Sequence, residues 1–200
     1  MTKPHLGVVI GTTRQHRFAD KPAHWIFQQA AERGDMTVEL IDLRDYVLPF
    51  FDEPQPPIFT PAKNPHAARW CAKVAAMDGY IFVTGEYNHS ISGALKNALD
   101  FPYAEFNKKP ASFIAYGNTG GARAVEHLRQ IACELELVPL RRAVHIGLNE
   151  YRGAVDESTG LGEHEHLAVA GRELLDEISW WATVLKTARD ETSPATRPTG

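Results

Sequence analysis

Cysteine is scarce in this sequence, with two residues, Cys71 and Cys133, among 200. They stand far apart and match no metal-ligand spacing, so neither a disulfide framework nor a cysteine-bound metal is expected. No apolar run approaches the roughly 18 residues of a membrane-spanning helix, and the N-terminal segment lacks the length of a signal peptide. We therefore expect a cytoplasmic protein with no membrane partner.

An excess of positive charge is also missing. The formal net charge is −4, which argues against a nucleic-acid partner. The sequence contains no Walker glycine–lysine loop, no G-x-G-x-x-G and no G-x-S-x-G, which excludes the signatures of P-loop, dinucleotide-binding Rossmann and serine hydrolase proteins. His145, His164 and His166 lack an accompanying carboxylate pattern, so no metal site is expected.

The chain does contain short apolar runs alternating with segments of helical periodicity. This rhythm predicts an α/β fold with a five-stranded parallel sheet, helices on both faces and the flavodoxin-like strand order 2-1-3-4-5. We expect one domain over residues 1–188 and a disordered tail over 189–200. Residues 49–61 read as a proline-rich surface loop and residues 153–162 as a mobile loop. Strands are expected at 5–11, 37–42, 79–84, 111–116 and 142–146, and helices at 20–33, 64–77, 94–100, 122–137 and 165–186.

In such a sheet, ligands bind beyond the carboxyl ends of the strands. The loop after the first strand, GTTRQHR, combines the hydroxyls of Thr12 and Thr13 with the guanidinium groups of Arg14 and Arg17 at a helix start. Helix N-termini, hydroxyls and arginines together suit a phosphate group. A solvated turn with two ordinary surface arginines fits the same residues.

The loop after the third strand begins GEYNHSISG and places Glu86, Tyr87, Asn88 and His89 in a row. This mixture of acidic, aromatic, amide and imidazole groups suits a flat heteroaromatic ring. A helix-capping loop is the alternative interpretation, with Asn88 or Ser92 as the cap.

The loop after the fourth strand, YGNTGGAR, is rich in glycine. Its glycines allow positive φ and close approach of the backbone to a ligand. A plain strand-to-helix turn is the alternative. The three unusual loops together predict a ligand site more strongly than any one of them.

The blocks GTTRQHR, GEYNHSISGALKNALDF and YGNTGGARAVEHLR resemble the motifs of the NADPH-dependent FMN reductase family, whose members include quinone, azo-compound and chromate reductases. The resemblance covers about residues 5–187. Thr12 stands where serine is usual and keeps the hydroxyl. Gly85 stands where proline is usual, which predicts a more mobile loop and puts FMN affinity in doubt.

The resemblance implies roles for individual residues. The FMN phosphate would be bound by Thr12, Arg14 and Arg17. The ring and ribityl chain would be lined by Glu86, Tyr87, Asn88 and His89, and approached from the other side by Tyr116, Gly117, Asn118 and Gly120.

The activity implied is electron transfer from NADPH or NADH, through bound FMN, to a small acceptor such as a quinone, free flavin, azo compound or metal oxyanion. Since FMN carries the chemistry, no catalytic side chain is expected. A homodimer or homotetramer is implied as well, and Trp180 and Trp181 are expected in the core or at a subunit interface. A flavodoxin-type electron carrier and a non-catalytic flavin-binding regulatory module remain the alternatives.

Overall fold

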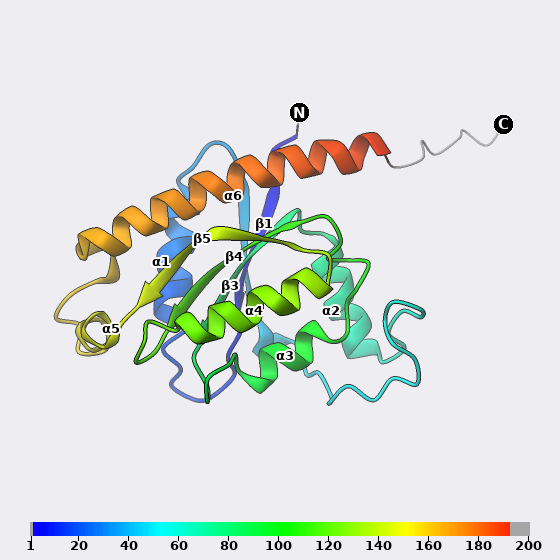
Figure 1. The fold of residues 1–200 in the computed structure, drawn as a ribbon, viewed down its shortest axis with the longest axis horizontal. Helices are drawn as coiled ribbons and strands as arrows, with labels where there is room; N and C mark the ends of the chain where they lie inside the picture. Colours follow the sequence, from blue (N-terminus) through cyan, green and yellow to red (C-terminus); the bar gives the residue numbers. More distant parts are fainter. Residues whose placement is uncertain (1, 193–200) are drawn as a thin grey trace.

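A computed structural model describes residues 2–192 of the chain (Figure 1). Its centre is a five-stranded sheet in the order β2-β1-β3-β4-β5, with every neighbouring pair parallel. The predicted flavodoxin-like α/β fold is therefore confirmed. The strands are β1 (His5–Ile10), β2 (Thr37–Asp42), β3 (Gly79–Gly85), β4 (Pro110–Tyr116) and β5 (Val138–Ile146).

Helices cover both faces of the sheet. One apolar cluster joins the sheet to α1 and α6, and a second joins it to α2, α3 and α4 (Figure 1). Every residue of β3 and β4 is buried, as expected for central parallel strands covered on both sides. The helices are α1 (Asp20–Ala31), α2 (Pro65–Ala75), α3 (Gly93–Leu99), α4 (Ala122–Glu134), α5 (Leu148–Val155) and α6 (Glu165–Thr192), and the 3-10 turns are η1 (Leu43–Asp45) and η2 (Leu161–Glu163).

Side-chain caps fix the starts of α2 and α3. The Asn64 side chain accepts a hydrogen bond from His66 N at 2.9 Å, and Pro65 occupies the first helical position of α2. Ser92 Oγ accepts from Leu95 N at 3.1 Å and donates to Gly11 O at 2.5 Å. The second of these bonds ties the start of α3 to the end of β1.

The C-terminal region differs from the sequence prediction in two places. Helix α5 was not predicted, and it takes up the first part of the expected loop at 153–162. Helix α6 continues through Thr192, so residues 189–192 are helical and only 193–200 of the predicted tail lie outside the described residues. Arg189 anchors this end, because its guanidinium donates to Lys108 O at 2.7 Å and to Asp78 Oδ1 at 2.8 Å.

The adjacent tryptophans of α6 have different surroundings. Trp181 packs against the cluster that includes α1 and α6, whereas Trp180 is 60% exposed. Within residues 2–192, no helix has both the length and the apolar character needed to cross a bilayer. The cytoplasmic location stays a prediction.

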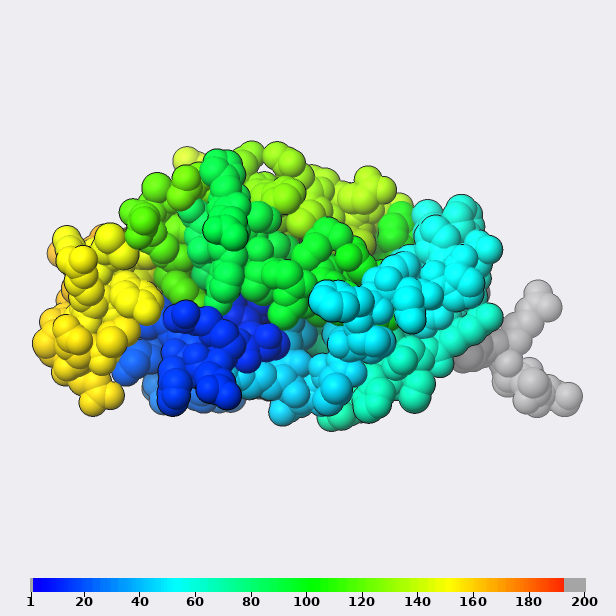
Figure 2. Space-filling view, turned by 90° about the horizontal axis from the view of Figure 1, so that it is seen from below, coloured from blue at the N-terminus to red at the C-terminus, as the bar shows by residue number. Residues whose placement is uncertain are grey.

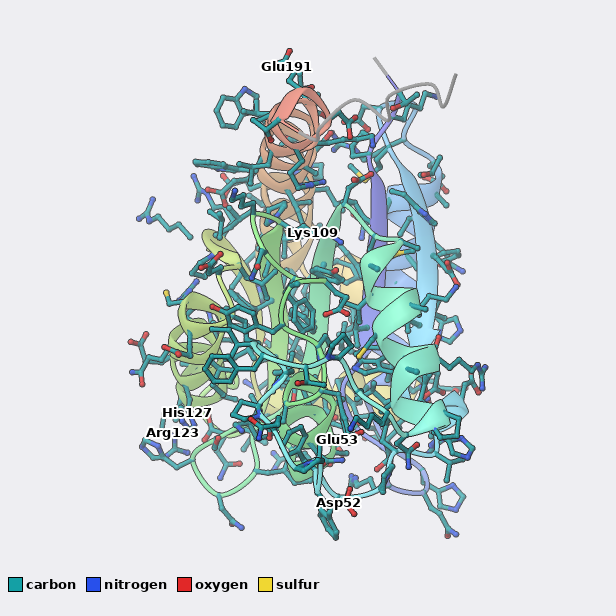
Figure 3. The ribbon with its side chains drawn as sticks, turned by 90° about the vertical axis from the view of Figure 1, so that its right-hand side faces the viewer. Asp52, Glu53, Lys109, Arg123, His127 and Glu191 are labelled. Carbon is teal, nitrogen blue, oxygen red and sulfur yellow. The ribbon has the colours of Figure 1, made fainter. Side chains whose placement is uncertain are left out.

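Lys109 is a buried charge at the amino end of β4, and Figure 3 shows it well above Arg123 and His127. Its Nζ donates to Val74 O at 3.2 Å and Ala75 O at 3.0 Å, the last carbonyls of α2. Burial lowers the pKa of Lys109 to about 8 from the ordinary 10.5.

This lowered pKa predicts a pH-dependent stability. The unfolded chain binds the Lys109 proton more tightly than the native state, so this residue's contribution to the free energy of unfolding rises as pH rises from 8 towards 10.5. Between pH 8 and pH 10, the free energy of unfolding of the wild type should rise by about 2 kcal/mol relative to that of Lys109→Met, as measured by urea unfolding. A difference between the two proteins that does not change with pH would contradict this assignment.

Candidate functional site

The three unusual loops meet at the carboxyl edge of the sheet, as predicted. Gly11 N donates to Val83 O at 2.8 Å, which joins the start of the loop after β1 to β3. Glu86 N donates to Tyr116 O at 2.9 Å, which joins the start of the loop after β3 to the end of β4. Seen from below, the blue segment after β1 borders green segments from the middle of the chain and the yellow region around α5 (Figure 2). Residues distant in sequence therefore form one surface.

The loop after β1 divides its polar side chains between the interior and the surface. Thr12 is completely buried, and its Oγ1 has no hydrogen-bond partner within residues 2–192. Arg14 is exposed, and its guanidinium makes no hydrogen bond or ion pair within the same range. An unpaired buried hydroxyl costs free energy, so Thr12 Oγ1 is a group whose partner a ligand can supply.

Arg17 is placed differently from Arg14, and its predicted contact with phosphate needs correction. Its side chain is 2% exposed and is ion-paired with Asp42 and Asp20. Nη1 also donates to Thr12 O at 2.6 Å. Burial opposes its charge, but the hydrogen bonds to Asp42 and Asp20 outweigh that effect and raise the pKa of Arg17. Its donors are thus already used inside the protein, and its role is internal.

The loop after β3 contains a tight hairpin turn. Tyr87 N donates to Ser90 O at 2.8 Å and Ser90 N to Tyr87 O at 3.0 Å, which leaves Asn88 and His89 as the two central residues. Their φ angles are 48° and 74°, so the turn belongs to the type with positive φ at both positions. Both side chains are exposed at the tip. Ser90 Oγ lies 2.6 Å from His127 Nδ1, which joins the turn to α4.

Glu86 joins this loop to the next one rather than facing the site. Its side-chain carboxylate is 4% exposed and is ion-paired with Arg123. Glu86 Oε2 also accepts from Thr119 Oγ1 at 3.1 Å and from Arg123 N at 3.3 Å. Burial opposes ionisation, but hydrogen bonds from Arg123 and Thr119 hold the pKa of Glu86 below its usual value. The predicted contact of Glu86 with a ring is thus replaced by a loop-to-loop tie.

Tyr116 lies at the centre of the site, at the end of β4. Its ring packs edge-on to Phe18 with centroids 4.9 Å apart. Its buried hydroxyl has no well-formed hydrogen bond within residues 2–192, and burial raises the pKa of Tyr116 to about 12. The side chain of Thr12 adjoins the same hydroxyl and opposes part of this rise in the pKa of Tyr116. Two buried, unsatisfied hydroxyls therefore adjoin one another beside Arg14.

Gly85 has a packing role that the sequence did not suggest. A Cβ at this position would lie 2.8 Å from Tyr116 Cε2 and 2.9 Å from Tyr87 Cε2. The absence of a side chain is what lets both tyrosine rings approach the end of β3. Greater mobility of this loop stays a prediction.

The loop after β4 turns sharply through glycines. Gly117 has φ +156°, Gly120 +65° and Gly121 +71°, conformations that L side chains rarely adopt. Asn118 is exposed between them. Beside this loop and the hairpin turn, a cavity of about 550 Å³ is lined by His89, Ala122, Arg123, Glu126, His127 and Gln130 (Arg123 and His127 in Figure 3).

The structure thus brings Thr12, Arg14, Tyr87 and Tyr116 together. Asn88, His89 and Asn118 lie at exposed loop tips, while Arg17 and Glu86 face inward. The donor set fits a phosphate: a guanidinium without a partner beside two buried hydroxyls. Within residues 2–192, no group of three or more His, Cys, Asp or Glu is arranged to hold a metal ion.

Sequence reasoning missed Asp42 and Arg44, which follow β2 and contact the loop after β1. A signal was available. In the predicted strand order β2 lies next to β1, so polar residues at the carboxyl end of β2 must border the same loop.

Comparison with known proteins decides the family. A sequence model described as NADPH-dependent FMN reductase matches residues 4–150. The chain belongs to this family. It is 31% identical over 166 residues to the NAD(P)H-dependent FMN reductase C4B3.06c of Schizosaccharomyces pombe, covering 80% of this chain and 83% of that protein. It is 37% identical over 139 residues to the NAD(P)H-dependent FMN reductase ntnL of a Nectria species, covering 66% and 68%.

Solved structures agree with this family assignment at the level of the fold. FerB, a flavoenzyme NAD(P)H:acceptor oxidoreductase from Paracoccus denitrificans, superposes with a TM-score of 0.70 at 23% identity. The match covers 90% of this chain and 97% of FerB. The family resemblance predicted from the three loop motifs is therefore confirmed, and this FMN reductase family member has the fold of flavin oxidoreductases.

Proposed function

We propose that this family member binds FMN at the carboxyl edge of its sheet and transfers electrons from NAD(P)H to a small acceptor of the quinone class. The observation that carries the proposal is the unpaired donor set beside β1, namely the Arg14 guanidinium with the hydroxyls of Thr12 and Tyr116. Buried hydroxyls without partners are uncommon in folded proteins, and a phosphate ester supplies the acceptors that they lack.

FMN, when bound, supplies the hydride and electron transfer. The protein's part is to hold and orient it. Thr12 and Arg14 would hold the phosphate with the Tyr116 hydroxyl beside them, and the turn at Tyr87, Asn88 and His89 would border the ring. Gly117, Asn118 and Gly120 line the opposite side, where the positive φ of the glycines allows a close approach of the backbone. The cavity between the hairpin turn and α4 is of a size suited to a small acceptor or the nicotinamide.

Catalytic turnover separates this proposal from its alternatives. Purified protein reconstituted with FMN is mixed with NADPH or NADH and a quinone, and absorbance at the reduced-nicotinamide band is followed. Steady oxidation that depends on both FMN and the quinone is expected. Bound flavin without NAD(P)H oxidation would favour a carrier or a regulatory module instead.

Arg14→Ala is expected to weaken FMN binding by about 10- to 100-fold, because a charge-assisted hydrogen bond to the phosphate is lost. Riboflavin has no phosphate, so its dissociation constant should stay within about twofold of the wild-type value. Both constants are measured by quenching of flavin fluorescence on apo-protein. Equal weakening for the two flavins would contradict the placement of the phosphate at Arg14.

A homodimer or homotetramer is also proposed. Phe50 is 88% exposed on the proline-rich segment and borders a cavity of about 490 Å³ that includes Leu48, Pro49, Gly93 and Ala94. An exposed apolar surface of this kind is typical of a subunit contact. Light scattering coupled to size exclusion tests it, and a strictly monomeric protein would reject it.

A further inference from the structure

Three successive carbonyl groups in the loop after β1 accept hydrogen bonds from guanidinium groups. Arg17 Nη1 donates to Thr12 O at 2.6 Å. Arg44 Nε donates to Thr13 O at 3.2 Å, and Arg44 Nη2 donates to Arg14 O. No catalytic or ligand-contacting role has been given to Arg44, which lies in η1 after the end of β2.

These contacts fix the direction of the loop's amides. In a trans peptide, the carbonyl of one residue and the N–H of the next point in opposite directions. With the three carbonyls turned towards arginines, the N–H groups of Thr13, Arg14 and Gln15 point the opposite way. Within residues 2–192, none of these three N–H groups donates a hydrogen bond. Successive free N–H groups facing one side form an anion-binding concavity.

Asp42 holds both arginines in place. Its Oδ1 accepts from Arg17 Nη1 at 2.7 Å and from Arg44 N at 2.9 Å, and its Oδ2 accepts from Arg17 Nη2. Asp42 is the last residue of β2 and pairs in register with Ile10, the last residue of β1. The edge strand β2 thus provides a fixed point from which the adjoining loop is oriented.

The charges of the two arginines are balanced differently. Arg17 is ion-paired with two carboxylates, Asp20 and Asp42. The Arg44 guanidinium contacts backbone carbonyls only, and it makes no ion pair within the described chain. Its planar fork spans two neighbouring carbonyls, a geometry that a lysine ammonium does not reproduce.

We infer that Arg44 is a positioning residue for the phosphate of FMN. It does not touch the phosphate. It holds the carbonyls of Thr13 and Arg14 away from the site, so that the intervening amides face the ligand. This inference rests on the proposed function, because it requires that the loop after β1 receives a phosphate.

The test compares FMN with riboflavin on apo-protein. Dissociation constants for both flavins are measured by fluorescence quenching for the wild type, Arg44→Ala and Arg44→Lys. Arg152→Ala serves as the matched control. Arg152 is an exposed arginine whose guanidinium makes no hydrogen bond within residues 2–192. It lies near the same loop, because its neighbour Tyr151 packs on Phe18. Urea unfolding of each apo-variant is followed in parallel.

We expect Arg44→Ala to weaken FMN binding about tenfold or more, with riboflavin binding within about twofold of the wild type. Arg44→Lys keeps the charge but not the fork, and should stay at least about fivefold weaker than the wild type for FMN. Arg152→Ala should change neither constant by more than about twofold.

Three results would overturn the inference: full recovery of FMN affinity by Arg44→Lys, which would leave charge alone as the cause; equal weakening for the two flavins; or no change in Arg44→Ala. A wild-type protein that binds FMN no more tightly than riboflavin would overturn the proposed phosphate site itself. That result is distinct, because it is seen before any variant is made.

Discussion

Replacing Arg17 with methionine is expected to lower the free energy of unfolding by about 2–4 kcal/mol, even without FMN. The buried guanidinium is ion-paired with Asp42 and Asp20 and also donates to Thr12 O. Its loss leaves two carboxylates and a carbonyl without this donor. Urea unfolding of the apo-protein at neutral pH measures the effect.

The pH dependence of this loss has a definite sign. Burial opposes ionisation of Asp42, but the hydrogen bond from Arg17 holds the pKa of Asp42 below its usual value. Stability from a lowered carboxyl pKa is present above the unfolded pKa and is lost as pH falls through the folded one. The difference in free energy of unfolding between the wild type and Arg17→Met should therefore become smaller below about pH 4.

Lys21→Met is the matched control for Arg17→Met. Lys21 lies in the first turn of α1, four residues after Arg17, and forms an ion pair with Glu157 at 3.4 Å, but both side chains are well exposed. Exposed ion pairs contribute about 0–1 kcal/mol, so this variant should lose little stability. Similar losses of stability in the two variants would show that the buried ion pairs of Arg17 stabilise the fold no more than an exposed ion pair does.

Gly121→Ala is expected to lower the free energy of unfolding by about 2–4 kcal/mol and to weaken FMN binding. Gly121 has φ +71°, and a Cβ there would lie 2.5 Å from Ala115 Cβ and 2.7 Å from Tyr116 N. The obstacle is mostly backbone of β4, which cannot move without disturbing the sheet. The glycine turn would have to shift, and Thr119 and Arg123, which hold Glu86, would shift with it.

Gly34→Ala is the control for the glycine substitution. Nothing lies within 4 Å of a Cβ at Gly34, and its φ is not in the left-handed region. This variant should match the wild type within about 0.5 kcal/mol in urea unfolding and should bind FMN normally. A Gly121→Ala protein as stable as Gly34→Ala would show that the turn adapts easily.

The fold could be predicted because apolar runs and helical periodicity act locally. The expected strand at 37–42 has the observed bounds, and Asn64 caps α2 as its sequence context indicated. Helix α5 was missed because it is short and has only one buried residue, Ala154, so its apolar pattern is weak. The C-terminal helix runs past the apolar region because ion pairs of Lys186 and Arg189 with Asp78 anchor it there.

The location of the site was equally accessible, but the partners of its charged groups were not. Arg14 and Arg17 have the same side chain in the same loop, yet only Arg17 meets carboxylates, Asp20 three residues away and Asp42 25 residues away in sequence. Glu86 likewise turns to Arg123, 37 residues away. Such pairings depend on strand register and side-chain direction, which motif spacing does not report.

Glu86 ties the segments after β3 and β4 into one unit, and Asp42 ties the segment after β1 to β2 as another. The two units adjoin at the buried hydroxyls of Thr12 and Tyr116. We expect cofactor loss to need separation of these two units, including the bond from Ser92 Oγ to Gly11 O, but not unfolding of the sheet beneath them. On warming, free FMN should therefore appear in solution at a lower temperature than the unfolding of the protein, which flavin fluorescence and circular dichroism can compare.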